Sequence, residues 1–233
     1  MIQLTQLSQR LYFPEPRHAL DEPNGLLAFG GDLSVARLRL AYQHGIFPWF
    51  SHGEPILWWS PDPRGILPLE HFYCSKKLAK IIRQRRWQVT LNNAFDQVID
   101  ACANIDRNGS GTWITQDMIN AYKQLHRAGH AHSIEVWEEQ HLIGGLYGVA
   151  SGKLFCGESM FHRVSDSSKV AMYYLVELMR QQGSPFIDCQ MQNSHLHSLG
   201  CIEISRQQFL HELAVLQQQQ FSTDCWLARR LSQ

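Results

Sequence analysis

Residues 131–160 read AHSIEVWEEQHLIGGLYGVASGKLFCGESM, and this stretch decides the fold. It contains three runs rich in apolar and β-branched residues, at 131–137, 142–149 and 153–160, separated by turn segments that contain EEQ and SG. Short runs of this kind, joined by tight turns, are typical of neighbouring antiparallel strands. The sequence therefore predicts a three-stranded antiparallel meander in the middle of a sheet.

Helix and strand patterns on both sides of the meander complete the domain. The expected elements are helices at 75–86, from an N-cap at Asn93, at 115–128, at 167–182, at 193–199 and from an N-cap at Ser205, with strands at 87–91 and 185–191. Capping residues and apolar i, i+3, i+4 spacing support the helices. The order β-α-α-β-β-β-α-β-α is that of the GNAT acyltransferase fold. We therefore expect an α+β, GNAT-like domain with a mixed, mainly antiparallel sheet flanked by helices.

The first sixty residues have a different composition. Seven of the nine prolines precede residue 64, and turn formers cluster there. One helix fits between them, at 34–44, with Ser34 as its N-cap and Gly45 as its stop. We predict two domains, a small loop-rich N-terminal domain at 1–64 and the GNAT-like domain at 65–233.

Composition limits the classes of protein to which the chain can belong. With 44% hydrophobic residues in 233, it can build a substantial core and is not a disordered chain. Lys plus Arg and Asp plus Glu both number 21, so the whole molecule does not attract nucleic acid by net charge, although a local basic patch still could. Six cysteines without a CxxC pair, no apolar signal region and no apolar run of about 20 residues predict a reduced, cytoplasmic protein without a membrane segment.

A basic run is the first candidate for function. It comprises six cations within eleven positions that contain no acid: Lys76, Lys77, Lys80, Arg83, Arg85 and Arg86. A solvated helix face is the ordinary explanation of such a run. Like charges at i and i+4 repel, however, so most exposed helix faces mix the two signs. The run therefore indicates a contact with the phosphate backbone of a nucleic acid.

Polar residues in two apolar strands are the second candidate. Glu158 interrupts the third strand of the meander, and Asp188 and Gln190 alternate onto one face of the strand at 185–191. A carboxylate in a central strand needs a hydrogen-bond donor, or its pKa rises. In a GNAT-like sheet these two strands meet at the splayed centre, so the three side chains are expected to converge there. Hydrogen bonds that only stabilise the sheet are the alternative.

Two negative features narrow the chemistry further. The His130/His132 and His195/His197 pairs lack the repeated Cys/His spacing of zinc sites, so we expect no metal. GNAT enzymes that use acyl-CoA hold its pyrophosphate with a glycine-rich loop after the meander, but residues 162–169 contain no glycine. An activated acyl donor other than CoA is therefore expected.

Two tryptophans in loop-rich segments are a further candidate. Trp49 and Trp113 could stack on a base, or they could simply fill a small core.

Seven blocks of the sequence resemble the bacterial leucyl/phenylalanyl-tRNA–protein transferases. They are EPNGLLA (22–28) with GGDLS (30–34), GIFPWF (45–50), WWSPDPR (58–64), GTWIT (111–115), HAHSIEVW (130–137), FCGESMF (155–161) and IDCQ (187–190). The blocks span most of the chain.

This resemblance implies an activity. An enzyme of this family transfers Leu or Phe, and less well Met, from aminoacyl-tRNA to the N-terminal α-amine of proteins that start with Arg or Lys, which marks them for degradation by the N-end rule pathway. It contacts the acceptor stem and 3′ end of the tRNA and uses no cofactor. The resemblance also implies a donor pocket lined by Trp49, Trp113, Tyr122, Leu146, Phe155, Met160, Leu175 and Ile187. Relatives carry Met and Phe at positions 146 and 175, so the preference among Leu, Phe and Met stays open.

The implied chemistry needs little from the protein beyond positioning. The donor ester is already activated, and roughly a tenth or more of an α-amine with a pKa near 7.7–8.0 is neutral at pH 7. We expect Gln190 Oε1 to orient the amine, Asp188 to hold Gln190 or nearby cations, and Glu158 to bind an ammonium or the basic side chain of the acceptor. Whether Asp188 is a general base stays open. The alternatives are an acyl-CoA N-acyltransferase and a non-enzymatic binder of basic N-termini or RNA ends.

Overall fold

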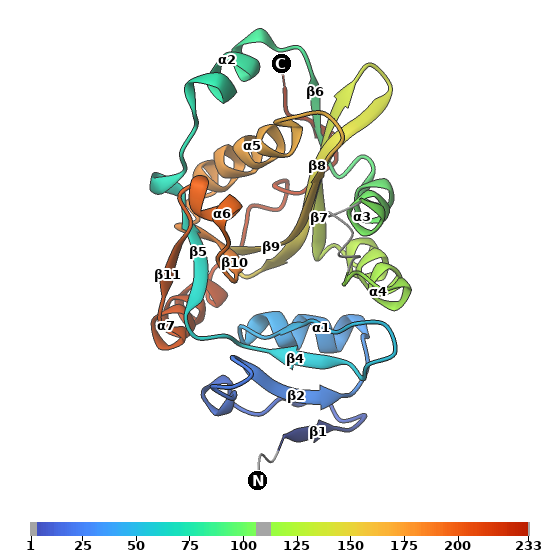
Figure 1. Cartoon of the computed structure of the whole chain (residues 1–233), viewed down its shortest axis with the longest axis vertical. Coiled ribbons are helices and arrows are strands. Elements are labelled where there is room, and N and C mark those ends of the chain that lie inside the picture. Colours follow the sequence, from blue (N-terminus) through green and yellow to red (C-terminus); the bar gives the residue numbers. More distant parts are fainter. Residues whose placement is uncertain (1–3, 106–112, 233) are drawn as a thin grey trace.

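The computed structural model describes residues 4–105 and 113–232, so residues 111 and 112 of the GTWIT block lie outside the described part (Figure 1). The first sixty residues form a small sheet of four strands in the order β1-β2-β4-β3. Its strands are β1 (Thr5–Leu7), β2 (Leu26–Gly30), β3 (Phe47–Pro48) and β4 (Leu57–Trp59). Each strand has only two to five residues, which is too short for a periodicity to be visible in the sequence.

The helix expected in this region is confirmed. Helix α1 spans Val35–Gln43, and the side chain of Ser34 accepts a hydrogen bond from Arg37 N as its N-cap. Gly45, with a φ of 72°, ends the helical region in the left-handed conformation that glycine adopts without strain. Figure 1 shows α1 between the small sheet and the rest of the molecule.

The rest of the chain builds a sheet of eight strands in the order β11-β5-β10-β9-β8-β7-β6-β12. These strands are β5 (Arg64–Pro68), β6 (Gln88–Leu91), β7 (Ala131–Glu138), β8 (His141–Ser151), β9 (Leu154–His162), β10 (Phe186–Gln190), β11 (Ile202–Ile204) and β12 (Arg229–Arg230). The predicted meander is β7-β8-β9. Strands β9 and β10 pair in parallel, and the other pairs among the described strands of this sheet are antiparallel. The mixed, mainly antiparallel sheet is therefore as expected.

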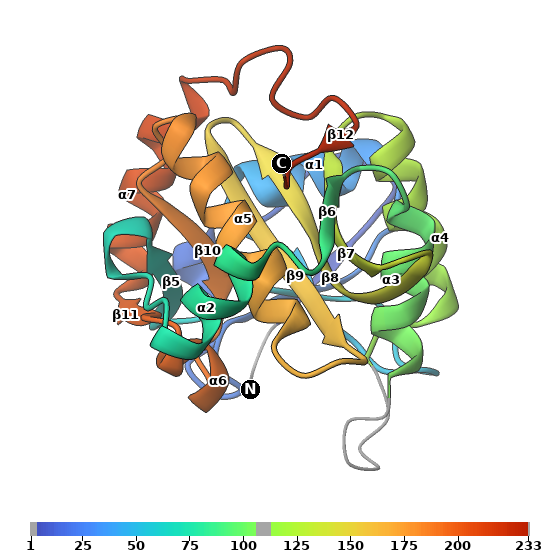
Figure 2. The same cartoon turned by 90° about the horizontal axis from the view of Figure 1, so that it is seen from above.

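Helices cover both faces of this sheet (Figures 1 and 2). One face packs against α3 (Phe95–Asn104) and α4 (Gln116–Arg127), and the other against α5 (Ser167–Gln181), which in turn contacts α2 (Lys76–Gln84). Two short helices of the 3₁₀ type (Pro16–His18 and Leu69–His71), α6 (Ser194–Ser198) and α7 (Arg206–Gln217) complete the described elements. Within the described residues, no helix combines the length and the apolar character needed to cross a membrane.

The expected N-cap at Asn93 is wrong. The capping position is Ala94, whose side chain makes no capping bond, and the backbone N–H of Asn93 donates instead to Glu135 Oε2 at 3.3 Å. A carboxylate from β7 therefore stabilises the start of α3, which is a contact between distant segments that the local sequence does not reveal.

The two parts of the chain are closely packed. Arg206 of α7 donates to the carbonyl of Ser60 at 2.7 Å, and its backbone N–H donates to Asp62 Oδ1 at 3.0 Å. One apolar cluster runs through both parts, from α1 and the small sheet to α3, α4 and α7. Arg64 already belongs to strand β5 of the large sheet. The division into domains at 1–64 and 65–233 stays a prediction.

Two bulges interrupt the centre of the large sheet. Along β8 and β9 the register passes from Tyr147↔Ser159 to Gly148↔Gly157, which leaves Glu158 as the extra residue. Along β5 and β10 the register passes from Ile66↔Asp188 to Gly65↔Gln190, which leaves Cys189 as the extra residue. Bulges bend a strand and redirect its side chains. Strands β9 and β10 pair at Phe155↔Ile187 and Cys156↔Asp188, and beyond this point no further pairs join their described residues.

The first bulge depends on a close approach at Gly148. A Cβ atom added there would overlap the carbonyl oxygen of Cys156 and lie 2.6 Å from the ring of Phe155. Gly148→Ala should therefore lower the free energy of unfolding by about 1–3 kcal/mol or more, as overpacking does. Urea denaturation followed by circular dichroism measures this change.

The cross-strand partner of Gly148 supplies the matched control. A Cβ atom at Gly157 would have its nearest neighbours at 3.8 Å, which is an ordinary contact. Gly157→Ala should change the free energy of unfolding by less than about 1 kcal/mol. Equal effects of the two substitutions would show that the close packing at Gly148 does not control the bulge.

Candidate active site

A cavity of about 660 Å³ lies where β9 and β10 separate. Its volume is in the range of small-molecule sites. Much of its wall is apolar and comes from β8, β9, α5 and β10, through Leu146, Met160, Met172, Leu175 and Ile187. Trp49 and Trp113 also line it, and Trp49 is 38% exposed. The cavity is therefore an apolar chamber that large aromatic side chains help to enclose.

Glu158 and Gln190 form the polar end of this chamber. Both side chains line the cavity, and Gln190 Nε2 donates to Glu158 Oε1 at 3.0 Å. The nitrogen of the amide therefore faces Glu158, whose oxygen accepts its hydrogen bond. This orientation leaves the amide oxygen of Gln190 as an acceptor for a donor that enters the cavity.

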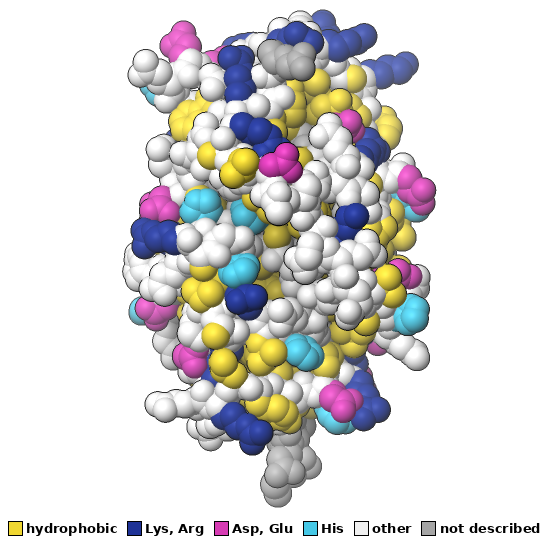
Figure 3. Space-filling view, turned by 180° about the vertical axis from the view of Figure 1, so that it is seen from behind, with side chains coloured by type: hydrophobic (Ala, Val, Ile, Leu, Met, Phe, Trp, Pro, Cys, Tyr) yellow, Lys and Arg dark blue, Asp and Glu magenta, His cyan; other side chains and the backbone are white. Residues whose placement is uncertain are grey.

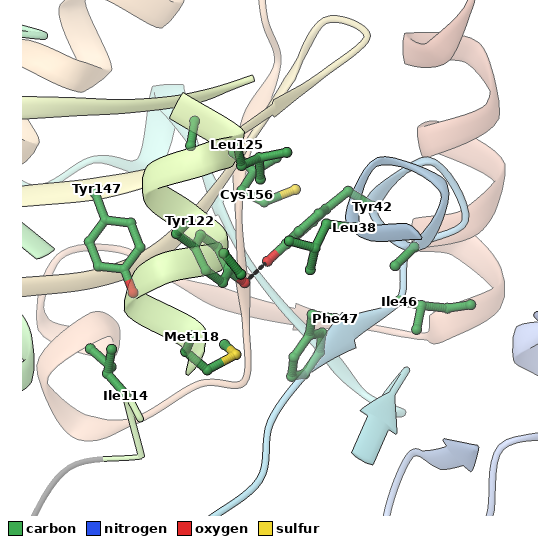
Figure 4. Packing of buried hydrophobic residues seen from close by; sticks show 14 of the residues in the cluster. Leu38, Tyr42, Ile46, Phe47, Ile114, Met118, Tyr122, Leu125, Tyr147 and Cys156 are labelled. Carbon is green, nitrogen blue, oxygen red and sulfur yellow. Dashed lines mark hydrogen bonds between the residues drawn. The ribbon is translucent and has the colours of Figure 1, made fainter. Parts of the chain in front are cut away.

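One tyrosine binds the other oxygen of Glu158, and a second tyrosine binds the first. The hydroxyl of Tyr122 on α4 donates to Glu158 Oε2 at 3.0 Å, and Tyr42 on α1 is hydrogen-bonded to Tyr122. Figure 4 shows the two rings meeting hydroxyl to hydroxyl between these helices. Burial raises the pKa of both tyrosines well above 10, so both keep their protons. The first part of the chain therefore contributes to the orientation of Glu158.

Glu158 titrates near neutral pH in the folded protein. Burial raises its pKa from about 4.5 to about 7, and the hydrogen bonds from Tyr42 and Tyr122 oppose this rise. The negative charge of Asp188 raises the pKa further, and the positive charge of Arg64 lowers it. A group whose charge changes near pH 7, within a cavity, is a marker of functional sites.

Asp188 lies behind the cavity and not in its wall. Arg64 holds it from the neighbouring strand β5, with Nε 2.8 Å from Oδ1 and Nη2 2.7 Å from Oδ2. The backbone N–H of Gln190 also donates to Oδ1, at 3.0 Å. The expectation that Asp188 and Gln190 share one face of the strand is wrong, because the bulge at Cys189 breaks the alternation. Cys189, expected on the opposite face, lines the cavity together with Gln190.

Arg64 and Tyr42 belong to the site but are not among the site residues predicted from the sequence, and Arg64 is the one bound to Asp188. Its side chain is 1% exposed, and it also donates from Nη1 to the carbonyl oxygen of Gly45 at 2.9 Å. Its identity as the partner of Asp188 depends on the pairing of β5 with β10, two segments separated by about 120 positions. Only a general signal for it exists in the sequence: a carboxylate in a central strand requires a donor, without any indication of which residue supplies it.

The structure brings together most of the expected pocket residues. Six of the eight line the cavity: Trp49, Trp113, Leu146, Met160, Leu175 and Ile187. Tyr122 acts from behind Glu158 and does not line the cavity itself. Phe155 is buried at the start of the β9–β10 pairing, with its ring 5.5 Å from that of Trp226. These two residues therefore support the cavity and do not form its surface.

The basic run lies on the surface beside α5. All six cations are exposed, but the helix ends at Gln84, so Arg85 and Arg86 follow it. Lys77 pairs with Asp166 and Arg86 with Glu138, so acids from other segments partly balance the run. Within the described part of the chain, the other four cations have no salt-bridge partner. Figure 3 shows Lys and Arg side chains gathered at the upper end of the molecule, where Figure 1 places α2.

The pKa of Glu158 predicts a dependence of stability on pH. Because the folded-state pKa of about 7 exceeds the ordinary value of 4.5, the stabilisation from the bound proton is complete below about pH 4.5 and is lost as the pH rises through 7. Glu158→Gln removes this titration. Its free energy of unfolding, relative to the wild type, should therefore increase by roughly 1–3 kcal/mol between about pH 5 and about pH 8.

Glu203→Gln is the matched control, since Glu203 is exposed on the edge strand β11. Urea denaturation at the two pH values measures both variants. If the curves for Glu158→Gln and the wild type stayed parallel across this range, the raised pKa of Glu158 would be disproved.

Comparisons with known proteins identify the family of this chain. The family model "Leucyl/phenylalanyl-tRNA protein transferase" matches residues 66–214, and the model of the N-terminal domain of that family matches residues 31–62. A protein of Pseudoalteromonas atlantica, named leucyl/phenylalanyl-tRNA–protein transferase, is 62% identical over 233 residues, which is 100% of both chains. A protein of the same name from Tolumonas auensis is 53% identical and covers 97% of this chain and 96% of its own.

Solved structures give a much weaker likeness. A GCN5-related N-acetyltransferase from Kribbella flavida aligns with a TM-score of 0.33 and 7% identity, over 71% of this chain and 59% of that one. A TM-score of this size supports no conclusion about function, so the assignment depends on the sequence relatives. Their identity over the full length, together with the two family models, shows that this chain belongs to the leucyl/phenylalanyl-tRNA–protein transferase family.

Proposed function

We propose that the protein transfers Leu or Phe, and less well Met, from aminoacyl-tRNA to the N-terminal α-amine of proteins that begin with Arg or Lys. The product carries a new N-terminal residue that marks it for degradation by the N-end rule pathway. One observation supports this function above the others. The apolar chamber ends at the amide of Gln190, whose nitrogen is bonded to Glu158 and whose oxygen is not. Because the donor is a charged tRNA, the reaction takes place in the cytoplasm.

The proposed reaction is an aminolysis of an ester. The neutral α-amine attacks the ester carbonyl, a C–N bond forms, and the C–O bond to the terminal ribose of the tRNA breaks. The proton lost by the amine ends on the released ribose hydroxyl, so no co-reactant is needed. About a tenth of an ordinary α-amine is neutral at pH 7, which makes a strong base unnecessary. Positioning of the two reactants can supply much of the rate acceleration.

Gln190 is proposed to position the attacking amine. Its Nε2 is engaged by Glu158, so its Oε1 can accept an N–H of the amine and direct the nitrogen lone pair at the carbonyl. Asp188 is engaged by Arg64 and by Gln190 N, which supports a positioning role and not that of a general base. Glu158 orients Gln190, and its negative charge favours an acceptor that carries a cationic N-terminal residue.

The apolar walls are proposed to hold the side chain of the donor. Leu146, Met160 and Leu175 offer flexible surfaces to an unbranched or γ-branched side chain. Such a pocket separates side chains by about 1–3 kcal/mol per methylene, so β-branched Val and Ile should be used less well. Trp49 and Trp113 supply faces on which the terminal base of the tRNA can stack. The basic run is proposed to contact the acceptor stem.

A transfer assay tests the function directly. The purified protein should attach labelled Leu, Phe or Met from tRNA to a peptide that begins with Arg or Lys, and Val much less. A peptide that begins with Ala, or an Arg peptide with an acetylated N-terminus, should accept little or nothing. Binding of the peptides without any transfer would show a non-enzymatic binder. Transfer from an acyl-CoA in place of the tRNA would show an ordinary GNAT enzyme.

Gln190→Ala tests the proposed role of the amide in the same assay. The loss of positioning should lower kcat by about 10²-fold. The KM for the charged tRNA should stay the same, because the apolar walls are intact. Gln124→Ala is the matched control, since Gln124 is exposed on α4. Normal turnover by Gln190→Ala would remove the orienting role.

Charge reversal on α2 tests the proposed tRNA surface. Lys80→Glu with Arg83→Glu should weaken the binding of any tRNA, because the phosphates are read without regard to sequence. The logarithm of the binding constant for tRNA falls as the logarithm of the salt concentration rises. This fall should become shallower by about 1 or more in slope, because each lost phosphate contact removes about 0.7–0.9 from its magnitude.

The control carries the same change of net charge on other surfaces. Arg17→Glu with Arg127→Glu changes two exposed arginines, which lie in a 3₁₀ helix and on α4. It should leave the salt slope of tRNA binding unchanged. Equal slopes for the two double variants would assign tRNA binding to another surface.

A further inference from the structure

We propose that Arg64 is a positioning residue for the reaction: it holds Asp188 in place, and Asp188 in turn holds the backbone of Gln190 in the conformation that presents its amide to the attacking amine. This inference depends on the proposed function. It names a residue that touches neither the substrate nor the wall of the cavity.

The surroundings of Arg64 fix its guanidinium on several sides. Two parallel N–H groups donate to the two oxygens of Asp188, and Nη1 donates to the carbonyl oxygen of Gly45. The guanidinium lies over the rings of Phe47, at 5.0 Å, and Phe209, at 4.4 Å. The guanidinium group of arginine suits such a site because it is planar and carries five N–H donors. It can form hydrogen bonds within its plane while aromatic rings stack on its faces. The position of Asp188 is thereby fixed by strands and helices from both parts of the chain.

A buried ion pair is not explained by stability alone. Removing two charges from water has a large free-energy cost, and apolar residues of similar volume often serve a fold equally well. The pair has a further effect here, because Asp188 Oδ1 also accepts the backbone N–H of Gln190 at 3.0 Å. Gln190 has a φ of 57°, in the left-handed region that is unfavourable for a residue with a side chain. The bond from Asp188 offsets this strain at the residue that carries the amide.

The residue after Arg64 supports the same conclusion. Gly65 lies opposite Gln190 in the β5–β10 register, and a Cβ atom there would be 2.8 Å from Gln192 N and 2.9 Å from the carbonyl carbon of Met191. The turn of chain after Gln190 therefore lies directly against the backbone of β5. Two consecutive residues of one strand shape the bulge, Gly65 by its absence of a side chain and Arg64 through Asp188.

The chain contains a second buried arginine that serves as a matched control. Arg37 is fully buried, and it bonds to Asp32 through Nε at 3.2 Å and Nη2 at 3.1 Å. It also donates to the carbonyl oxygen of Ser8 at 2.7 Å. None of these residues lines the cavity or contacts Glu158, Asp188 or Gln190. Arg37 therefore forms a similar two-bond contact with an aspartate, although Asp32 is 45% exposed, and none of its hydrogen bonds leads to Asp188 or Gln190.

The first experiment compares Arg64→Lys with Arg37→Lys in the transfer assay. Lysine keeps the charge but cannot bond to both oxygens of an aspartate and to a carbonyl in one plane. Arg64→Lys should lower kcat by about tenfold while the KM for Leu-tRNA stays within about twofold, because the donor pocket is unchanged. Arg37→Lys should leave both kcat and KM within about twofold of the wild type. Its melting temperature should fall about as much as that of Arg64→Lys.

The second experiment shows whether Arg64 acts through Gln190. In a Gln190→Ala background, Arg64→Lys should lower the remaining kcat by less than about twofold, since residues that act in one chain of contacts are not additive. A merely structural role would reduce kcat by the same factor in both backgrounds and would overturn the proposal. An effect of Arg64→Lys no larger than that of Arg37→Lys would overturn it as well.

Asp188→Asn covers the case in which Arg64→Lys does not fold. It keeps the shape of the side chain and removes the charge that Arg64 binds. Asp188→Asn should lower kcat in the wild-type background. In the Gln190→Ala background it should have no further effect, so the double variant should be no slower than Gln190→Ala alone. A further reduction in the double variant would assign Asp188 an independent role, such as a base, and would overturn the proposal. If the wild type itself transferred no amino acid, the proposed function would fail instead.

Discussion

The separation of β9 and β10 is the constraint on which the site depends. These neighbours pair in parallel at Phe155↔Ile187 and Cys156↔Asp188, and each carries a bulge just beyond that point. A continuous ladder would place the strands about 4.8 Å apart and would leave no space between them. Because the strands diverge, side chains and not backbone groups meet in the gap. Glu158 and Gln190 come together there, at the polar end of the cavity.

The geometry at this gap is maintained by both parts of the chain. Tyr42 of α1 reaches Glu158 through Tyr122, and the carbonyl of Gly45 at the end of α1 receives a hydrogen bond from Arg64. Gly45 also lies against α7, where a Cβ atom would be 2.9 Å from the side chains of Phe209 and Leu210. The small sheet and its helix therefore do more than cover the large sheet. They hold the residues that orient Glu158 and, in the proposed reaction, those that orient Gln190.

The sequence predicted those features that depend on local periodicity. The meander, the helices at 34–44, 115–128 and 167–182, and the strand that carries Asp188 were all found close to the expected positions, because strand alternation, helical spacing and capping residues act over a few residues. Strands β5 and β11 and the small sheet were not predicted, since their pairing depends on partners far away in the chain. The same reason explains the cap of α3 by Glu135 and the partner of Asp188. The face of Asp188 was predicted wrongly because a bulge, which has no clear sequence signal, shifts the alternation by one residue.

Charge pairing within the site bears on the choice of acceptor. Arg64 and Asp188 neutralise each other behind the cavity, and their effects on the pKa of Glu158 have opposite signs. Burial is the largest cause of the pKa of about 7, so near neutral pH Glu158 is divided between its charged and uncharged forms. A cationic group that enters the chamber favours the carboxylate and lowers this pKa, since opposite charges stabilise each other at close range. In the proposed reaction, an acceptor that begins with Arg or Lys would bring such a cation. An acceptor without one would meet a glutamate that is protonated about half of the time, and the proposed preference for basic N-termini has its physical basis in this difference.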